Sequence, residues 1–199
     1  VNLDPEQCGG ELYDRYPQIL SEIKSTAIAH GFQGEFSADE LRFETWTPST
    51  TNPCAVFDRT AGKYYAREIV HHLGEDVSVS IVWNGDTQVQ VVERLGTLMA
   101  GAKAAPLPFE INSPVDVASY TFTLPNGDRL VAIWNHVDIA DEDTAFVTSL
   151  TFPGLTTKKV IGIEVLQGIE QELVTETEND NLVIRNLLIK DCPLIIRLS

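Results

Sequence analysis

The periodicity of the apolar residues changes once along this chain, between about residues 104 and 116. Before this point apolar side chains recur every three or four residues, and after it they alternate with polar ones. The first spacing is typical of amphipathic helices, and the second is typical of half-buried strands. We therefore predict an α/β segment over residues 1–103 and an all-β domain over residues 104–199.

The α/β segment is predicted to alternate helices and strands. Helices are expected at 11–29, 58–74 and 86–101, where apolar stripes end at or near glycine. Strands are expected at 32–38 and 77–83. Two strands joined by a helix pair in parallel through a right-handed crossover. Two parallel strands and three helices form only part of a (β/α) barrel-like unit, because a parallel sheet requires covered faces and edges.

The all-β domain is predicted to be a sandwich. Residues 104–114 contain three prolines and are expected to be a linker. The regular spacing of the strands that follow, with turn residues between them, is typical of an antiparallel sandwich or barrel. The fold class is thus an α+β composite that ends in a β-sandwich. About seven strands are expected, at 118–124, 129–135, 146–152, 160–166, 170–177, 182–189 and 194–198.

The charge of the chain excludes two classes of partner. The formal net charge is −15, from 29 acidic and 14 basic residues. An acidic surface repels phosphate backbones and anionic lipids, so we predict no nucleic-acid and no membrane partner. No apolar run approaches the roughly 18 residues that a membrane span needs. Neutral polyols such as sugars remain compatible with this charge.

The cysteines and the N-terminus give little information on the compartment. Cys8, Cys54 and Cys192 are far apart and form no Cys-x-x-Cys pair, so no zinc site is predicted. Reduced thiols would fit a cytoplasmic protein. The first residues, VNLDPEQCGG, have no features of a signal peptide and resemble the interior of a longer chain. We assign no compartment and expect no cofactor.

Two polar clusters are interpreted without a bound metal. His71 and His72 lie near the end of the second predicted helix, where they are expected to offset the helix dipole. The loop HVDIADED offers carboxylates that could bind calcium, but it lacks the central glycine and distal glutamate of an EF-hand loop. We predict that this loop is solvated. Its polar residues are His136, Asp138, Asp141, Glu142 and Asp143.

Candidate chemistry lies at the ends of the two predicted parallel strands. Glu40 is expected just past the first strand, and Trp83 ends the second strand and is followed by Asn84. The carboxyl ends of parallel strands meet at one edge, where α/β proteins carry their active sites. A carboxylate can attack an oxocarbenium-like sugar carbon while an indole stacks on the ring. From spacing alone, a rim carboxylate or helix cap and a core tryptophan explain these residues at least as well.

The order of elements resembles the last part of a clan A glycoside hydrolase, a (β/α)8 barrel followed by a C-terminal β-sandwich. The run GFQGEFSADEL resembles its seventh strand, and FDRTAGKYYAREIVHHLGEDVSVSIVW resembles the next helix and strand. The C-terminal residues from Ile161 resemble the appended sandwich. The resemblance implies that Glu40 is the nucleophile, with Glu35 and Glu44 as alternatives. It also implies that Trp83 and Asn84 bind substrate.

One part of the expected catalytic apparatus has no counterpart. A retaining glycosidase needs a second carboxyl group roughly 5 Å from the nucleophile, which protonates the leaving oxygen. In this clan that group comes from an Asn-Glu pair on the fourth strand, and this sequence contains no Asn-Glu pair. The resemblance implies a C-terminal fragment that is inactive alone. Because two strands and three helices leave parallel-sheet edges and apolar helix faces to be covered, we also predict that the chain self-associates or pairs with the missing barrel part. The alternative is a carbohydrate-binding or protein-interaction β-sandwich module without catalysis.

Overall fold

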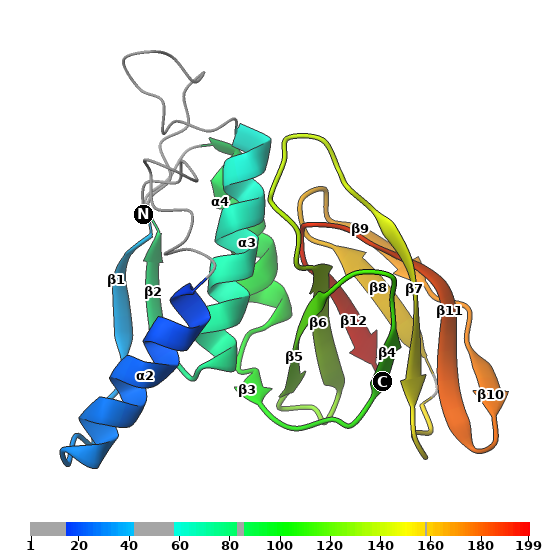
Figure 1. Ribbon diagram of the computed structural model, residues 1–199, viewed down its shortest axis with the longest axis horizontal. Coiled ribbons are helices and arrows are strands. Elements are labelled where there is room, and N and C mark those ends of the chain that lie inside the picture. The colour runs from blue at the N-terminus through cyan, green and yellow to red at the C-terminus, as the bar shows by residue number, and fades with distance from the viewer. Residues whose placement is uncertain (1–14, 42–57, 83–85, 158) are drawn as a thin grey trace.

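The computed structural model describes residues 15–41, 58–82, 86–157 and 159–199. The α/β segment has the predicted alternation of helices and strands (Figure 1). The two strands pair in parallel and form a two-stranded sheet. The elements are α2 (Tyr16–Ala29), β1 (Ser37–Leu41), α3 (Asp58–Gly74), β2 (Val79–Val82) and α4 (Asp86–Leu98).

The first strand begins later than predicted. The prediction was 32–38, whereas β1 covers Ser37–Leu41. The rings of Phe32 and Phe36 contact each other edge to face, with centroids 5.0 Å apart. Gly31 has φ +86°, which turns the chain directly after α2. Residues 32–36 of the predicted strand therefore form the connection that leads into β1, and Ser37 and Ala38 are its first two residues.

Helix α2 covers little of the described structure. None of its residues is buried, and the side chains of Ile23 and Ile28 are 56% and 59% exposed. The apolar stripe that predicts this helix is thus present but only partly packed within the described residues, because Tyr16, Ile19 and Ala27 are half-buried and Ile23 is exposed. On β2, Val79 and Ile81 are similarly 45% and 47% exposed. The outer helix and one face of the strand pair are both apolar surfaces without cover from the described residues.

Residues 103–157 and 159–199 contain ten strands in two sheets. The six-stranded sheet has the order β3-β5-β6-β12-β8-β9, and the four-stranded sheet has the order β10-β11-β7-β4. All pairings in both sheets are antiparallel. The strands are β3 (Lys103–Ala104), β4 (Glu110–Asn112), β5 (Val117–Thr123), β6 (Arg129–Asn135), β7 (Phe146–Phe152), β8 (Val160–Glu164), β9 (Ile169–Glu172), β10 (Glu176–Glu178), β11 (Asn181–Ile189) and β12 (Leu194–Leu198).

The sandwich prediction is confirmed, but two parts of it are corrected. The predicted linker at 104–114 contributes two short edge strands, because β3 pairs with β5 and β4 pairs with β7. Its prolines interrupt the chain between these strands, where no ladder hydrogen bonds are needed. The predicted strand at 170–177 is divided into β9 and β10, which belong to different sheets.

The molecule has two apolar cores in successive layers. The second core lies between the two sheets and includes Leu150, Phe152 and Ile196. The first lies between α3, α4 and the outer face of the six-stranded sheet (Figure 1). Helices and sheet therefore share one core. The buried members of this first core are Ala66, Val70, Val91, Leu95, Met99, Phe122, Leu124, Leu130, Ala132, Trp134, Ile163, Val165, Cys192 and Ile195.

Candidate active-site edge

The carboxyl ends of β1 and β2 lie side by side. The last residue of β1, Leu41, pairs with Val82, the last residue of β2. Glu40 directly precedes Leu41 in the strand, so its backbone lies within β1 and not past its end as predicted. Trp83 and Asn84 follow Val82 in the sequence and lie outside the described residues, as does the side chain of Glu40.

The strand carrying Glu40 has an irregularity at this edge. Ala38 pairs with Ser80, and the next paired residues are Leu41 and Val82. Two residues of β1 between these pairs therefore oppose a single residue of β2, and the extra residue is Asp39 or Glu40. Such a bulge bends a strand and re-aims its side chains, and bulges are over-represented next to active sites.

The two alternative nucleophiles are placed differently from Glu40. Glu35 is exposed and precedes β1, so its backbone is at the amino end of the strand, away from the edge where β1 and β2 end. Glu44 lies outside the described residues. The structure describes the backbone of Glu35 and of Glu40. Of these two candidates, Glu40 is the one that lies at the carboxyl edge.

A buried polar cluster holds α2, α3 and β2 together beside the strand pair. The Tyr16 hydroxyl lies 2.5 Å from His72 Nε2, and the Ser80 hydroxyl lies 2.7 Å from His72 Nδ1. Glu68 is fully buried, with Oε2 3.8 Å from His72 Nε2. Neither carboxylate oxygen of Glu68 has a hydrogen-bond partner among the described residues. Burial raises the pKa of Glu68 to about 8, so this carboxyl group is mostly protonated at neutral pH.

The protonation of Glu68 predicts a specific pH dependence of stability. An exposed glutamate has a pKa of about 4.5 and Glu68 has a pKa of about 8, so the folded chain binds the extra proton between these values. The contribution of Glu68 to stability should therefore fall as pH rises through this window, whereas the low pKa values of His71 and His72 raise stability between about pH 4 and pH 6.5. Glu68→Gln removes the Glu68 contribution, so its free energy of unfolding at pH 8, relative to that at pH 5, should be higher than in the wild type, as measured by urea unfolding. Glu35→Gln, at an exposed position, should keep the wild-type dependence, and the wild-type dependence in Glu68→Gln would contradict the assignment.

The two histidines of α3 are neutral in the folded protein, which corrects the dipole interpretation. Burial lowers the pKa of His71 to about 3 and that of His72 to about 4. His71 Nδ1 lies 2.9 Å from the Tyr120 hydroxyl, and its ring contacts Trp134 edge to face. A neutral imidazole does not offset a helix dipole. His71 instead packs α3 onto the six-stranded sheet.

A second polar cluster joins the other face of α3 to the sandwich. Lys63 is fully buried, and its ammonium group lies 3.0 Å from Asp191 Oδ2 and 3.1 Å from Asp143 Oδ1. It also donates to the carbonyl oxygens of Ala140 and Glu142, at 2.6 and 3.2 Å. One turn later, Arg67 donates to the carbonyl oxygens of Asn135, Val137 and Asp191.

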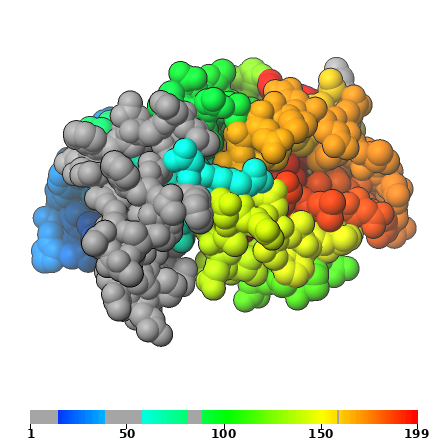
Figure 2. Space-filling model, turned by 90° about the horizontal axis from the view of Figure 1, so that it is seen from above, coloured from blue at the N-terminus to red at the C-terminus, as the bar shows by residue number. Residues whose placement is uncertain are grey.

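The acidic loop at 136–143 is solvated as predicted at His136, Asp138, Asp141 and Glu142, which are exposed, but Asp143 is half-buried and held by cations. Asp143 receives hydrogen bonds from Arg59 at 2.7 Å and Lys190 at 2.6 Å, as well as its contact with Lys63. These cations hold the pKa of Asp143 well below its usual value, although partial burial opposes them. Figure 2 shows α3 in cyan directly beside yellow-green residues of the sandwich. The sequence indicated the charges of this loop but not the buried Lys63, which contacts the Asp143 carboxylate and two carbonyl oxygens of the loop.

Several other predictions can be compared with the described residues. No group of His, Cys, Asp and Glu within them has a geometry that could hold a metal ion. Cys192 is a free thiol, and its burial raises its pKa well above the usual value. Cys8 and Cys54 lie outside the described residues. None of the described helices combines the length and apolarity needed to cross a bilayer.

The comparisons with known proteins found similarity in structure but no match in sequence. No family model matches the sequence, and no curated protein matches it. The GH51 arabinofuranosidase from Xanthomonas axonopodis pv. citri superposes with a TM-score of 0.53 and 13% identity, over 94% of this chain and 46% of that one.

Two further solved structures have lower scores. The catalytic domain of GH30 xylanase C from Talaromyces cellulolyticus has a TM-score of 0.48 at 11% identity, over 84% of this chain and 41% of that one. A GH27 β-L-arabinopyranosidase from Geobacillus stearothermophilus has a TM-score of 0.45 at 11% identity, over 94% and 42%. The chain thus shares its fold with the GH51 arabinofuranosidase, and it spans less than half the length of these three structures.

Proposed function

We propose that this chain is the C-terminal part of a retaining glycoside hydrolase, with Glu40 as the nucleophile. Residues 1–103 would supply the end of the barrel, and residues 104–199 the accessory sandwich. The observation that carries the proposal is the bulge at Asp39 and Glu40, at the edge where the carboxyl ends of the parallel strands meet. The fold shared with glycoside hydrolases supports the same reading.

The proposed chemistry follows the retaining pathway. The carboxylate of Glu40 attacks the anomeric carbon, and the bond from that carbon to the leaving oxygen breaks as a second carboxylic acid protonates the oxygen. Water then hydrolyses the glycosyl-enzyme ester, with the second group acting as base. Trp83 stacks on the sugar ring and Asn84 hydrogen-bonds its hydroxyl groups. The second carboxyl group would come from upstream barrel strands of the parent enzyme, so the chain alone would be inactive.

The open faces of the α/β segment support a larger parent or a partner. Val79 and Ile81 on β2, and Ile23 and Ile28 on α2, are about half exposed. Parallel sheets are almost always covered on both faces, and apolar patches of this kind mark interfaces. Upstream (β/α) units would cover both surfaces. Self-association through the same residues is the other way in which the chain could bury them.

Substitution of the nucleophile tests the proposal in a chain that carries upstream barrel units. In that chain Glu40→Gln should lower the hydrolysis of aryl glycosides by more than about a thousandfold, because an amide does not form the covalent intermediate. Glu35→Gln is the matched control and should retain activity, since Glu35 precedes β1. Full activity of Glu40→Gln would exclude Glu40 as the nucleophile.

A further inference from the structure

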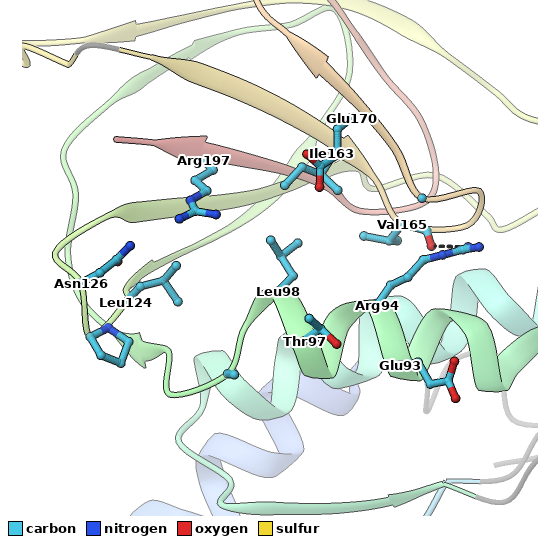
Figure 3. A pocket seen from close by; sticks show the side chains of 13 residues that line it. Glu93, Arg94, Thr97, Leu98, Leu124, Asn126, Ile163, Val165, Glu170 and Arg197 are labelled. Carbon is cyan, nitrogen blue, oxygen red and sulfur yellow. Dashed lines mark hydrogen bonds between the residues drawn. The ribbon is translucent and has the colours of Figure 1, made fainter.

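A cleft of about 640 Å³ lies between α4 and the six-stranded sheet (Figure 3). This volume lies within the range of small-molecule sites, which occur preferentially where two structural units meet. The helices α3 and α4 lie between the strand pair β1–β2 and the six-stranded sheet (Figure 1), and the residues that line the cleft come from α4, the segment after it and the sandwich. The cleft is therefore distinct from the candidate active-site edge. Its middle is lined by the aliphatic side chains of Leu98, Leu124, Ile163 and Val165.

One end of the cleft is held by a network around Arg197. The guanidinium group donates to Asp128 Oδ2 from Nε at 2.6 Å and from Nη2 at 2.5 Å. The Asn126 side chain donates to the same oxygen at 3.0 Å and accepts from the Asp128 amide at 3.1 Å. These bonds fix the polar groups of Arg197 and Asn126 before any ligand arrives, which lowers the entropic cost of binding.

The other end is held by Arg94 of α4. Its Nη1 donates to the carbonyl oxygens of Val165 and Leu166, and its Nη2 donates to the Gln90 side chain. The same turn is fixed by Glu164, which accepts hydrogen bonds from the amides of Leu166 and Gln167. Each end of the cleft is thus a fixed hydrogen-bonding rim, and the stretch between them is apolar.

The charges of the lining residues balance. Arg94 and Arg197 contribute two positive charges, and Glu93 and Glu170 contribute two negative ones. The rims offer donors from guanidinium and amide groups and acceptors from carboxylate and hydroxyl oxygens. A neutral ligand with hydroxyl groups at its edge and an apolar face matches this lining, because the lining residues carry no net charge that would favour an ionic ligand.

We propose that this cleft is a second carbohydrate-binding site, which holds one or two neutral sugar units on the aliphatic floor between the two rims. The choice of a sugar among neutral polyols rests on the proposed function. The site holds the carbohydrate chain against the junction of helix and sandwich, apart from the bond that is cleaved. Its ligand contacts come from residues of α4, the β5–β6 turn, β8, β9 and β12.

Titration of the full chain with hexasaccharides that each contain a single kind of sugar tests this proposal. Isothermal titration calorimetry should detect binding of xylohexaose or cellohexaose, both neutral. Thr97 is exposed and lines the cleft, so the larger side chain in Thr97→Trp should obstruct part of it and weaken that binding at least about tenfold, or 1.4 kcal/mol. Asn126→Ala should weaken it severalfold by removing one rim. Thr177→Trp, at an exposed position of β10, is the matched control and should leave affinity unchanged.

Three results would overturn the proposal. These are no binding of either neutral hexasaccharide at millimolar concentration, binding that Thr97→Trp leaves intact, and tighter binding of hexagalacturonate than of the neutral probes. The outcome is separable from that for the active-site edge. Glu40→Gln should not change the titration, and Thr97→Trp should not change the covalent chemistry at Glu40.

Discussion

Replacing Lys63 by alanine is expected to lower the free energy of unfolding by about 3–5 kcal/mol. Lys63 and Asp191 are both fully buried, and the Lys63 ammonium group lies 3.0 Å from the Asp191 carboxylate. Without it, Asp191 would keep a buried negative charge, and the carbonyl oxygens of Ala140 and Glu142 would lose a donor. Urea unfolding followed by tryptophan fluorescence measures the effect.

A neighbouring cation provides the control for this experiment. Lys190 also contacts Asp143, but its side chain is 34% exposed. Lys190→Ala should therefore cost less than about 1 kcal/mol, as surface ion pairs do. The double variant Lys63→Met, Asp191→Leu removes both buried charges and should recover much of the loss. Equal effects of Lys63→Ala and Lys190→Ala would contradict a buried ionic link between α3 and the sandwich.

Residues 104–199, produced without the preceding helices, are expected to lose their cooperative fold. The outer face of the six-stranded sheet would expose Phe122, Leu130, Trp134 and Ile195, which α3 and α4 cover in the full chain. An apolar surface of this kind promotes aggregation. Differential scanning calorimetry should show no sharp transition for the fragment, and it should bind a hydrophobic dye strongly.

The same fragment separates the two functional hypotheses. A freestanding carbohydrate-binding or protein-interaction module would be monomeric, would unfold cooperatively and would bind its ligand by itself. A chain over residues 58–199, which retains α3 and α4, is the control and should unfold cooperatively. A stable, ligand-binding 104–199 fragment would favour the module over the enzyme fragment.

The secondary structure was largely predictable because most of it follows local patterns. The period of 3.6 found α2, α3 and α4, and short apolar runs that follow turn residues found β6 and β12 with their observed bounds. Local patterns were insufficient where strands are short. The edge strands β3 and β4 have two and three residues, too few for an apolar period, and are defined by their pairing partners.

The candidate site was predictable in type but not in geometry. Motif resemblance pointed to Glu40, and the parallel pairing of β1 and β2 follows from the helix between them. The bulge did not show in the sequence, because one extra residue in a five-residue strand leaves no clear apolar pattern. The buried contact between Lys63 and Asp191 spans 128 residues, so no local rule could find it.

Covalent trapping of the nucleophile tests the central claim most directly. A 2-deoxy-2-fluoro glycosyl fluoride would be incubated with a chain that includes upstream barrel units, and the peptides then analysed by mass spectrometry. Accumulation of the glycosyl ester on Glu40 is the predicted result, because the 2-fluoro group slows both the formation and the hydrolysis of the intermediate, whereas the fluoride leaving group speeds only its formation. A label on Glu35, Glu44 or another carboxylate, or turnover with no covalent intermediate, would contradict the assignment.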